Sequence, residues 1–265
     1  MSGAAWWQQD FYSFDEETTG VNVRADRIVT ATLTHVDPVA RTHTALEWLA
    51  DPGVEIPEAA SKVHGVTTER ARDEGRPAIE VVAEIFEALK EVFASGKALV
   101  IYNAPYDLTL LGCEMLRHFD EKAFFVPECV VDPLVIDKRV NERVRGQGAR
   151  KLVNTCRRNG IVLSEQEAHT SAGDTLAAAR LAWVQASKSR LIGGVDLDVL
   201  HQRQRMWFRD QSMNFAEWLD RQGQAESADR CRAEADSWPV HELRLEEMAL
   251  PEPPPVTESG GEVPF

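Results

Sequence analysis

The sequence predicts an α/β fold, and four stretches carry that prediction. Residues 27–36 alternate and are rich in β-branched side chains, and residues 42–49 follow a turn, which is typical of two paired strands. Residues 98–102 form a continuous apolar run, as expected of a buried central strand. Residues 77–96 place apolar side chains at helical spacing, which predicts a long amphipathic helix. At 265 residues and 43% apolar content, the chain can bury a full core around such elements.

A first strand is expected to begin in the aromatic run 6–12 and to end in a turn at Gly20. Side chains alternate across a strand, so Asp15 and Glu17 would share one face and Glu16 would lie on the other. Neighbouring carboxylates repel each other unless a cation lies between them, and Mg²⁺ prefers one or two carboxylates plus substrate phosphate oxygens. Asp15 and Glu17 are therefore candidate metal ligands, and a solvated acidic turn is the alternative.

The remaining elements are expected in a simple order along the chain. His64 should be a structural turn residue, because no acid or histidine partner lies at ligand spacing. The expected segments are a short helix at 57–63, a helix at 108–115, a strand at 124–131, helices at 133–140, 149–159 and 175–187, and two further helices at 197–219 and 225–235.

Two more sites carry groups suited to catalysis. Asp107 follows the central strand on the first turn of a helix, where the helix dipole favours a carboxylate. His169 is expected on a loop, and Asp174 on or near the first turn of the next helix. In α/β sheets, functional groups collect at strand ends and adjoining helix starts, so these sites can converge. Four carboxylates and one histidine are what metal-assisted phosphodiester hydrolysis needs.

These motifs resemble the DnaQ-like family of 3′–5′ exonucleases, in its DEDDh class, which includes proofreading subunits of bacterial replicative polymerases. The first motif reads FDEETTG at residues 14–20, the second NAPYD at 103–107, and the third is His169 with Asp174 five residues further on. The stretch IPEAASKVHGVT at 56–67 resembles another segment of the family. The resemblance covers about residues 8–188, with all motifs in order.

The resemblance implies a ribonuclease H-like mixed β-sheet flanked by helices, and it implies roles for the motif residues. His169 would deprotonate the attacking water, and the product would be a 5′-mononucleotide. Two Mg²⁺ or Mn²⁺ ions would be held by Asp15, Glu17, Asp107 and Asp174. The 3′-terminal nucleotide would be bound around Thr18 and Thr19, with Gly20, Asn103 and Tyr106 as further candidates.

Two positions depart from the family pattern. Glu16 replaces the usually uncharged middle residue of the first motif, either adding local repulsion or lying exposed at the strand end. Ser171 stands where alanine is frequent. Neither change removes a catalytic group, so an active enzyme is expected.

The charge of the chain is unevenly distributed. The formal net charge is −14, and residues 191–265 hold 15 acidic and 7 basic residues. Residues 138–158 hold eight basic residues and one acid, Glu142. A local basic stripe can bind a phosphate backbone whatever the total charge, and a solvated helical face is an equal alternative.

The sequence predicts three regions: an exonuclease domain at 1–190, a helical C-terminal extension at 191–250, and a disordered acidic tail rich in proline and glycine at 251–265. The helix at 197–219 is expected to pack back on the nuclease core rather than to stand as an exposed partner helix. The last four residues, Glu262 to Phe265, resemble the tip of bacterial single-stranded-DNA-binding proteins. We therefore expect that they tether the chain to a replication or repair protein, with an inert solvated tail as the alternative.

The chain is expected to be cytoplasmic and not to bind membranes. No apolar run approaches the roughly 20 residues that span a bilayer, and residues 1–10 lack the features of a signal peptide. The four cysteines are scattered, which favours reduced structural thiols.

Taken together, the motifs predict a metal-dependent exonuclease that acts on 3′ ends of DNA in proofreading or repair. An RNA-trimming enzyme of the same superfamily and a non-catalytic replication scaffold are the alternatives.

Overall fold

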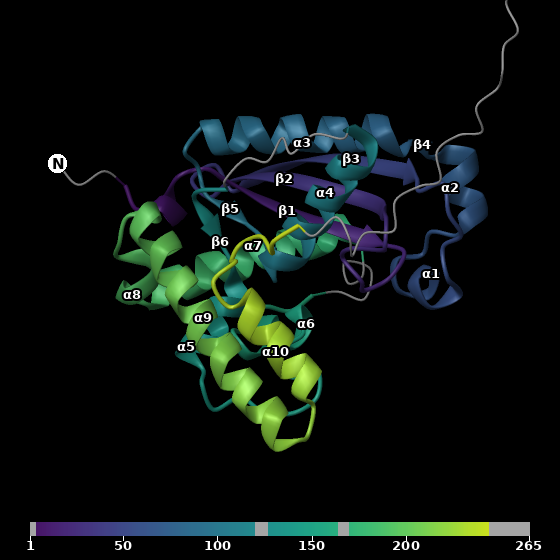
Figure 1. Ribbon diagram of the computed structural model, residues 1–265. Helices are drawn as coiled ribbons and strands as arrows, with labels where there is room; N and C mark the ends of the chain where they lie inside the picture. Colours follow the sequence, from purple (N-terminus) through teal and green to yellow (C-terminus); the bar gives the residue numbers. More distant parts are fainter. Residues whose placement is uncertain (1–3, 120–126, 164–169, 244–265) are drawn as a thin grey trace, which may run out of the picture.

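A mixed sheet lies at the centre of the molecule (Figure 1). The computed structural model describes residues 4–119, 127–163 and 170–243. Within these ranges the sheet has six strands in the order β4-β3-β2-β1-β5-β6. Their bounds are Phe11–Thr18 for β1, Ile28–Asp37 for β2, Thr42–Asp51 for β3, Arg76–Pro77 for β4, Leu99–Val100 for β5 and Val130–Val131 for β6.

The pairing of the strands brings the motif-bearing ends to one edge. β1 pairs with β2, and β2 with β3, in antiparallel register, which confirms the predicted strand pair. β1, β5 and β6 run parallel to one another. Parallel strands end at the same edge of a sheet, so the chain leaves β1 and β5 on the same side of the molecule.

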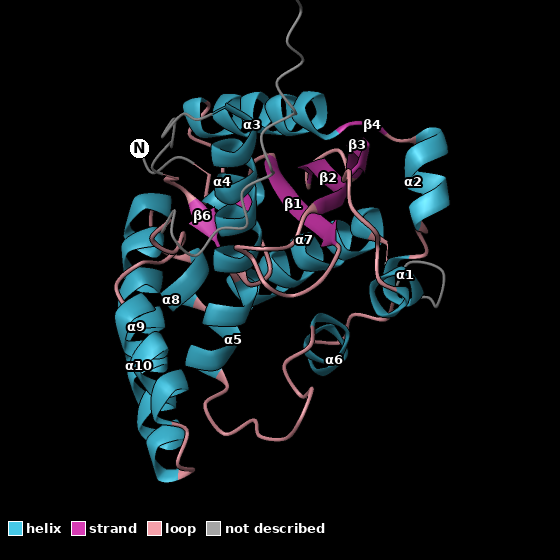
Figure 2. Ribbon diagram, turned by 45° about the vertical axis from the view of Figure 1, so that its right-hand side comes forward, coloured by secondary structure: helices cyan, strands magenta, loops and turns pink. Residues whose placement is uncertain are grey.

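Helices cover both faces of the sheet (Figures 1 and 2). α3 and α4 lie on one face and α7 on the other; α9 stands beside β6 and α5, and α10 packs against α9 (Figure 2). The 3₁₀-helix η1 spans Trp6–Gln8, and the α-helices are α1 Glu58–His64, α2 Thr68–Glu74, α3 Ala78–Ala94, α4 Ala104–Phe119, α5 Pro133–Val140, α6 Leu152–Arg158, α7 Ser171–Lys188, α8 Arg190–Gly193, α9 Leu197–Arg221 and α10 Ala225–Glu234.

α7 approaches the sheet closely because the residues that face it are small. Its buried side chains include four alanines at 177, 178, 179 and 182. Two hydroxyl pairs join the helix to β2: Thr32 Oγ1 lies 2.7 Å from Ser171 Oγ, and Thr34 Oγ1 lies 2.8 Å from Thr175 Oγ1. The helix begins earlier than the predicted residue 175, because Thr170 caps it by accepting the N–H of Gly173 at 3.1 Å.

The helical extension shares the hydrophobic core of the sheet. Ile192, Leu200 and Trp207 belong to the same buried cluster as β1 and β5. Gln204 is fully buried; its amide nitrogen donates to Val130 O at 2.9 Å and its amide oxygen accepts the N–H of Asp132 at 2.7 Å. The prediction that this helix packs back on the core is confirmed over its first half. Beyond Trp207, the side chains of Phe215 and Trp218 remain about half exposed.

Several details differ from the sequence-based expectations. Of the strand expected at 124–131, the described part forms only β6 at Val130–Val131, and residues 120–126 lie outside the described ranges. Helix α2 was not expected; Thr67 caps it by accepting the N–H of Arg70 at 3.2 Å. His64 is a turn residue as predicted, with its Nδ1 accepting the N–H of Val66. His169 and the tail at 251–265 also lie outside the described ranges.

The four cysteines are free thiols, in line with the sequence. Among the described residues, no helix combines the length and the apolarity needed to cross a bilayer.

Candidate active site

Three carboxylates meet at the edge where β1 ends. Oxygen atoms of Asp15, Glu17 and Asp174 all lie within 4.8 Å of one another. Asp15 is directly opposite Thr32 in the antiparallel ladder, so both side chains point to the same face. Thr32 contacts Ser171 on the first turn of α7, and Asp174 lies three residues further along that helix. The hydroxyl contacts between β2 and α7 therefore bring Asp174 to the two acids of β1.

Asp107 joins this group from the second motif. It is buried on the first turn of α4, with 3% of its surface exposed. Its Oδ1 accepts the backbone N–H of Glu16 at 3.1 Å, so α4 is tied directly to β1. The four predicted metal ligands are thus brought together from the end of one strand and the starts of two helices.

The four carboxylates perturb one another. Burial, followed by the charges of Asp107 and Asp174, raises the pKa of Asp15 well above its ordinary value. Burial also raises the pKa of Asp107, against the opposing effect of the Glu16 N–H. The pKa of Glu17 rises to about 7, through burial first and the charge of Asp174 second. Such a site binds either protons or a cation.

The donor set fits a divalent metal ion. The contributing atoms are carboxylate oxygens, which are the ligands that hard cations such as Mg²⁺ and Mn²⁺ prefer. They come from separate elements that are held in place by hydrogen bonds rather than from one flexible loop.

The turn that presents the second motif is held by a residue that the motifs did not identify. Asn103 has a left-handed backbone with φ of 71°, and its N–H donates to Asp132 Oδ1 at 3.0 Å. Asp132 Oδ2 accepts the N–H of Ala104 at 3.1 Å, and Oδ1 also accepts the N–H of Leu134 at 2.9 Å. One buried carboxylate therefore caps α4 and α5 together. An aspartate immediately before a proline is a helix-start signal, so this role had a sequence signature.

The candidates for nucleotide binding lie at the same edge, with their side chains engaged internally. The Tyr106 hydroxyl donates to Gly20 O at 2.6 Å and lies 2.6 Å from Thr18 Oγ1. Thr19 Oγ1 donates to Asp26 Oδ1 at 2.8 Å. A Cβ on Gly20 would come within 3 Å of the Asp26 carboxylate, so a larger residue here would displace the Asp26 side chain. These hydroxyls shape the loop after β1.

Glu16 is buried, so the expectation that left it exposed at the strand end is wrong. It retains 6% exposure, on the strand face opposite to Asp15 and Glu17. Neither carboxylate oxygen has a hydrogen-bond partner among the described residues. Burial, with repulsion from Asp107, Glu114 and Asp15, raises the pKa of Glu16 well above its ordinary value. The alternative expectation, added local repulsion, is therefore confirmed.

Comparison with known proteins assigns the family. The exonuclease (RNase T) family profile matches residues 13–182, which span the acidic cluster and the second motif. The chain belongs to this exonuclease family. The recognition of a DnaQ-like 3′–5′ exonuclease from its motifs is confirmed.

Two curated relatives carry the name of subunit epsilon of DNA polymerase III. A DNA polymerase III subunit epsilon-like protein of Rhodobacter capsulatus is 33% identical over 174 residues, which cover 64% of this chain and 22% of that protein. The DNA polymerase III subunit epsilon of Rickettsia conorii is 28% identical over 129 residues, covering 48% of this chain and 53% of that protein. The chain thus spans about a fifth of the first and about half of the second.

Solved structures of exonuclease I share the fold. Escherichia coli exonuclease I in complex with a dT13 oligonucleotide superposes with a TM-score of 0.54 at 19% identity, over 67% of this chain and 41% of that one. A complex of exonuclease I with the C-terminal segment of SSB gives 0.56 at 17% identity, over 71% and 43%. This likeness confirms the predicted ribonuclease H-like mixed sheet flanked by helices.

Proposed function

We propose that this chain is a two-metal-dependent 3′–5′ exonuclease that releases 5′-mononucleotides from DNA in proofreading or repair. The observation that carries the proposal is the carboxylate cluster of Asp15, Glu17 and Asp174, within 4.8 Å, with Asp107 tied beside it. The relatedness to polymerase III epsilon proteins supports DNA as the substrate.

The side chains divide the work of phosphodiester hydrolysis. Asp15, Glu17, Asp107 and Asp174 would hold two Mg²⁺ or Mn²⁺ ions, which when bound polarise the phosphoryl group and lower the pKa of water. The Glu16 N–H fixes the Asp107 carboxylate, and the Thr170 cap fixes the helix turn that carries Asp174. His169 would take the proton of the attacking water, since its ordinary pKa lies near neutrality.

A second proposal concerns a protein partner of the last four residues. Glu262 to Phe265 would bind a replication or repair protein, as suggested by their resemblance to the tip of single-stranded-DNA-binding proteins. Exonuclease I, which shares the fold, has a solved structure in complex with the C-terminal segment of SSB. Deleting these four residues should abolish pull-down of the partner and leave the nuclease rate unchanged. An unchanged pull-down would remove the proposal.

An end-labelled digestion assay tests the enzymatic proposal. Single-stranded DNA and RNA of one sequence, labelled at either end, are incubated with Mg²⁺, with Mn²⁺ or with chelator. We expect metal-dependent release of mononucleotides from the 3′ end, faster from DNA than from RNA. Preference for RNA would move the chain to RNA trimming with the same site. Absence of cleavage of either substrate would favour a non-catalytic scaffold.

A further inference from the structure

A large cleft opens beside the second motif, and one of its walls lies outside the region matched by the exonuclease family. The cleft has a volume of about 1590 Å³ and lies between the second half of α9 and the segment that joins α5 to α6. Asn103, four residues before Asp107, forms part of its wall. The cleft therefore reaches the turn that presents the second motif.

The cleft is basic, although the whole chain is strongly acidic. Six basic and three acidic residues line it, against a formal net charge of −14 for the chain. Among the described residues, the cleft-lining Arg145, Lys151 and Arg221 have no carboxylate within ion-pair distance. Arg145 donates instead to backbone carbonyls of Glu142 and Val144.

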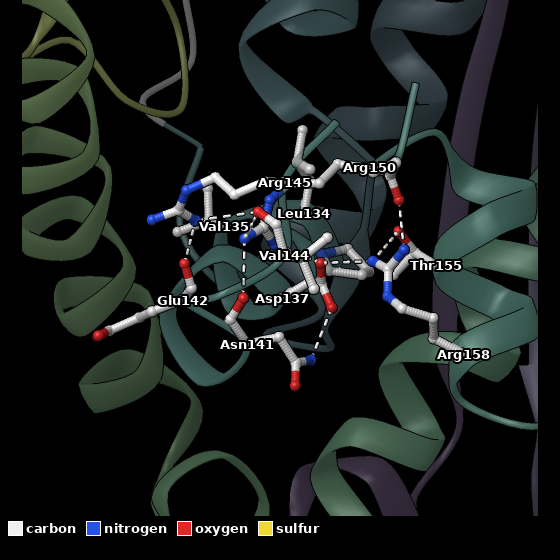
Figure 3. A network of polar contacts seen from close by, with 12 residues as sticks. Leu134, Val135, Asp137, Asn141, Glu142, Val144, Arg145, Arg150, Thr155 and Arg158 are labelled. Carbon is white, nitrogen blue, oxygen red and sulfur yellow. Dashed lines mark hydrogen bonds and ion pairs between the residues drawn. The ribbon is translucent and has the colours of Figure 1, made fainter. Parts of the chain in front are cut away.

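Within the basic stripe at 138–158, the ion pairs among the described residues use other side chains than Arg145 and Lys151. Arg150 and Arg158 both bind the buried carboxylate of Asp137, at 2.5 and 2.9 Å (Figure 3). Arg145 lies on the opposite side of this network from Arg158 (Figure 3). Asp137 thus neutralises part of the stripe and braces the loop that carries Arg145. Part of the stripe is therefore neutralised by ion pairs, and part of it keeps its positive charge unpaired among the described residues.

Two aromatic rings stand on the other wall of the cleft. Phe215 and Trp218 are stacked, with ring centroids 5.6 Å apart and planes 10° from parallel, and they are 51% and 45% exposed. The packing of α9 on α10 uses other side chains, namely Ala216, Leu219 and Ala228. The two rings therefore lie outside the buried cluster that joins α9 to α10.

We propose that this cleft binds the single-stranded nucleic acid that leads to the 3′ end in the active site. Phe215 and Trp218 stack against a base, and Arg145, Lys151 and Arg221 contact phosphates. Aromatic platforms beside a cationic track are the usual means of holding single strands, because every base offers a flat face. Paired bases in a duplex do not offer that face, so the cleft selects single strands. This inference rests on the proposed exonuclease function.

Oligonucleotide binding without turnover tests the aromatic wall. The assay measures the fluorescence anisotropy of labelled oligo(dT) with chelator present. The oligonucleotide has about 16 nucleotides, which is the upper end of the site size of a small single-strand-binding fold. Phe215→Ala/Trp218→Ala should weaken binding about tenfold or more. Met206→Ala is the control, since this exposed side chain of α9 does not line the cleft. Trp218→Phe should retain most of the affinity.

The salt dependence of the same binding tests the cationic wall. Arg145→Glu/Lys151→Glu should reduce the slope of log K against log salt by about 0.7 for each phosphate that the protein no longer neutralises. Arg41→Glu makes the charge change of one of these two substitutions in the turn between β2 and β3, away from the cleft, and should leave the slope unchanged. A duplex of the same length should bind weakly to every variant.

The outcomes separate this inference from the proposed function. Wild-type affinity in the aromatic double variant would overturn the inference, as would failure of the wild-type protein to bind oligo(dT). Concentration-dependent dimerisation that this variant abolishes, with unchanged affinity, would show that a second copy covers the rings and would also overturn it. Binding by the wild type without digestion when metal is added would contradict the proposed function while the cleft assignment stands.

Discussion

The Asp107 carboxylate accepts a 3.1 Å hydrogen bond from the backbone N–H of Glu16, which joins the second acidic motif to the first. Glu16 lies between Asp15 and Glu17 on β1, so the same strand that supplies two carboxylates also orients a third. The geometry of the site therefore depends on backbone contacts as well as on side-chain charges.

Asp107→Asn should abolish most of the nuclease activity without unfolding the protein. The amide oxygen can still accept the Glu16 N–H, while the negative charge needed for a cation is lost. We expect kcat/KM to fall at least about a hundredfold. Losing a residue that only supports a metal ligand already costs about 10- to 100-fold, and Asp107 would be a ligand itself. Asp15→Ala should behave similarly.

Thermal unfolding of Asp107→Asn and of Asp15→Ala should show a Tm equal to or above that of the wild type, because the mutual repulsion of the acids is relieved. Glu91→Gln, an exposed change on α3, is the matched control for charge loss. A near-normal nuclease rate in either Asp107→Asn or Asp15→Ala would remove the metal-site assignment.

The metal-free protein should lose stability as the pH rises. Glu17 has a pKa of about 7 in the folded chain and of about 4.5 as an ordinary carboxyl group, so the folded state binds more protons between these values. Its stabilising contribution is complete below about 4.5 and is lost as the pH rises through about 7. Urea unfolding with chelator across this range should show the decline.

Added Mn²⁺ should reverse that decline, because a cation replaces the protons at high pH. The increase in Tm with Mn²⁺ should therefore be larger at pH 8 than at pH 5. Equal increases at both values would mean that these carboxylates do not form the metal site.

Glu16→Gln should stabilise the fold. The glutamate is buried, unpaired among the described residues and close to Asp107 and Glu114, so removing its charge relieves desolvation and repulsion. We expect a gain of about 1 kcal/mol in the free energy of unfolding, the low end of the cost of an unsatisfied buried group, because the amide removes the charge but stays unpaired. Chemical denaturation measures it, and Glu47→Gln on exposed β3 is the control. A clear loss of stability would mean that Glu16 is paired in solution.

Asp132→Ala should impair both folding and positioning. Four backbone N–H groups, from Asn103, Ala104, Leu134 and Val135, lose their acceptor, and each helix cap is ordinarily worth about 0.5–2 kcal/mol. We expect a loss of about 1–4 kcal/mol for the two caps together. Asp132→Asn should recover part of the stability, with kcat recovering in parallel because the turn before Asp107 is re-formed. Full recovery of Tm with no recovery of kcat would contradict a positioning role.

Truncation after residue 190 should prevent folding of the exonuclease domain as a stable monomer. Ile192, Leu200, Trp207 and Trp238 belong to the central core, and each buried large apolar side chain contributes about 1.5–3 kcal/mol. Together they approach the total stability of about 5–15 kcal/mol of an ordinary domain. Circular dichroism and size exclusion of residues 1–190 against 1–243 provide the measurement. A folded, monomeric 1–190 would show that the predicted domain boundary is also a folding boundary.

The sequence predicted the position of each acid on its own strand or helix, because those determinants are local. Alternation along β1 places Asp15 and Glu17 on one face, and a helix start places Asp107 and Asp174. The long elements were also predicted, since residues 77–96 and 197–219 carry strong helical patterns.

Other features depend on contacts that no local pattern encodes. Gln204 is polar and lies in the middle of a helix, yet it is buried because β6 offers both Val130 O and the Asp132 N–H. The partner of Arg150 and Arg158 is a buried acid, Asp137, which spacing alone does not reveal. β6 is short, and its pairing with β5 depends on tertiary position rather than on the apolar run at 124–131.

The stoichiometry of metal binding tests the central claim most directly. Isothermal titration of the metal-free protein with Mn²⁺ at pH 8 should show two ions bound per chain, and Asp15→Asn/Asp174→Asn should abolish saturable binding while the protein remains folded. Wild-type protein that is folded and binds no Mn²⁺, or a double variant that still binds two ions, would contradict the assignment of this carboxylate cluster as the catalytic metal centre.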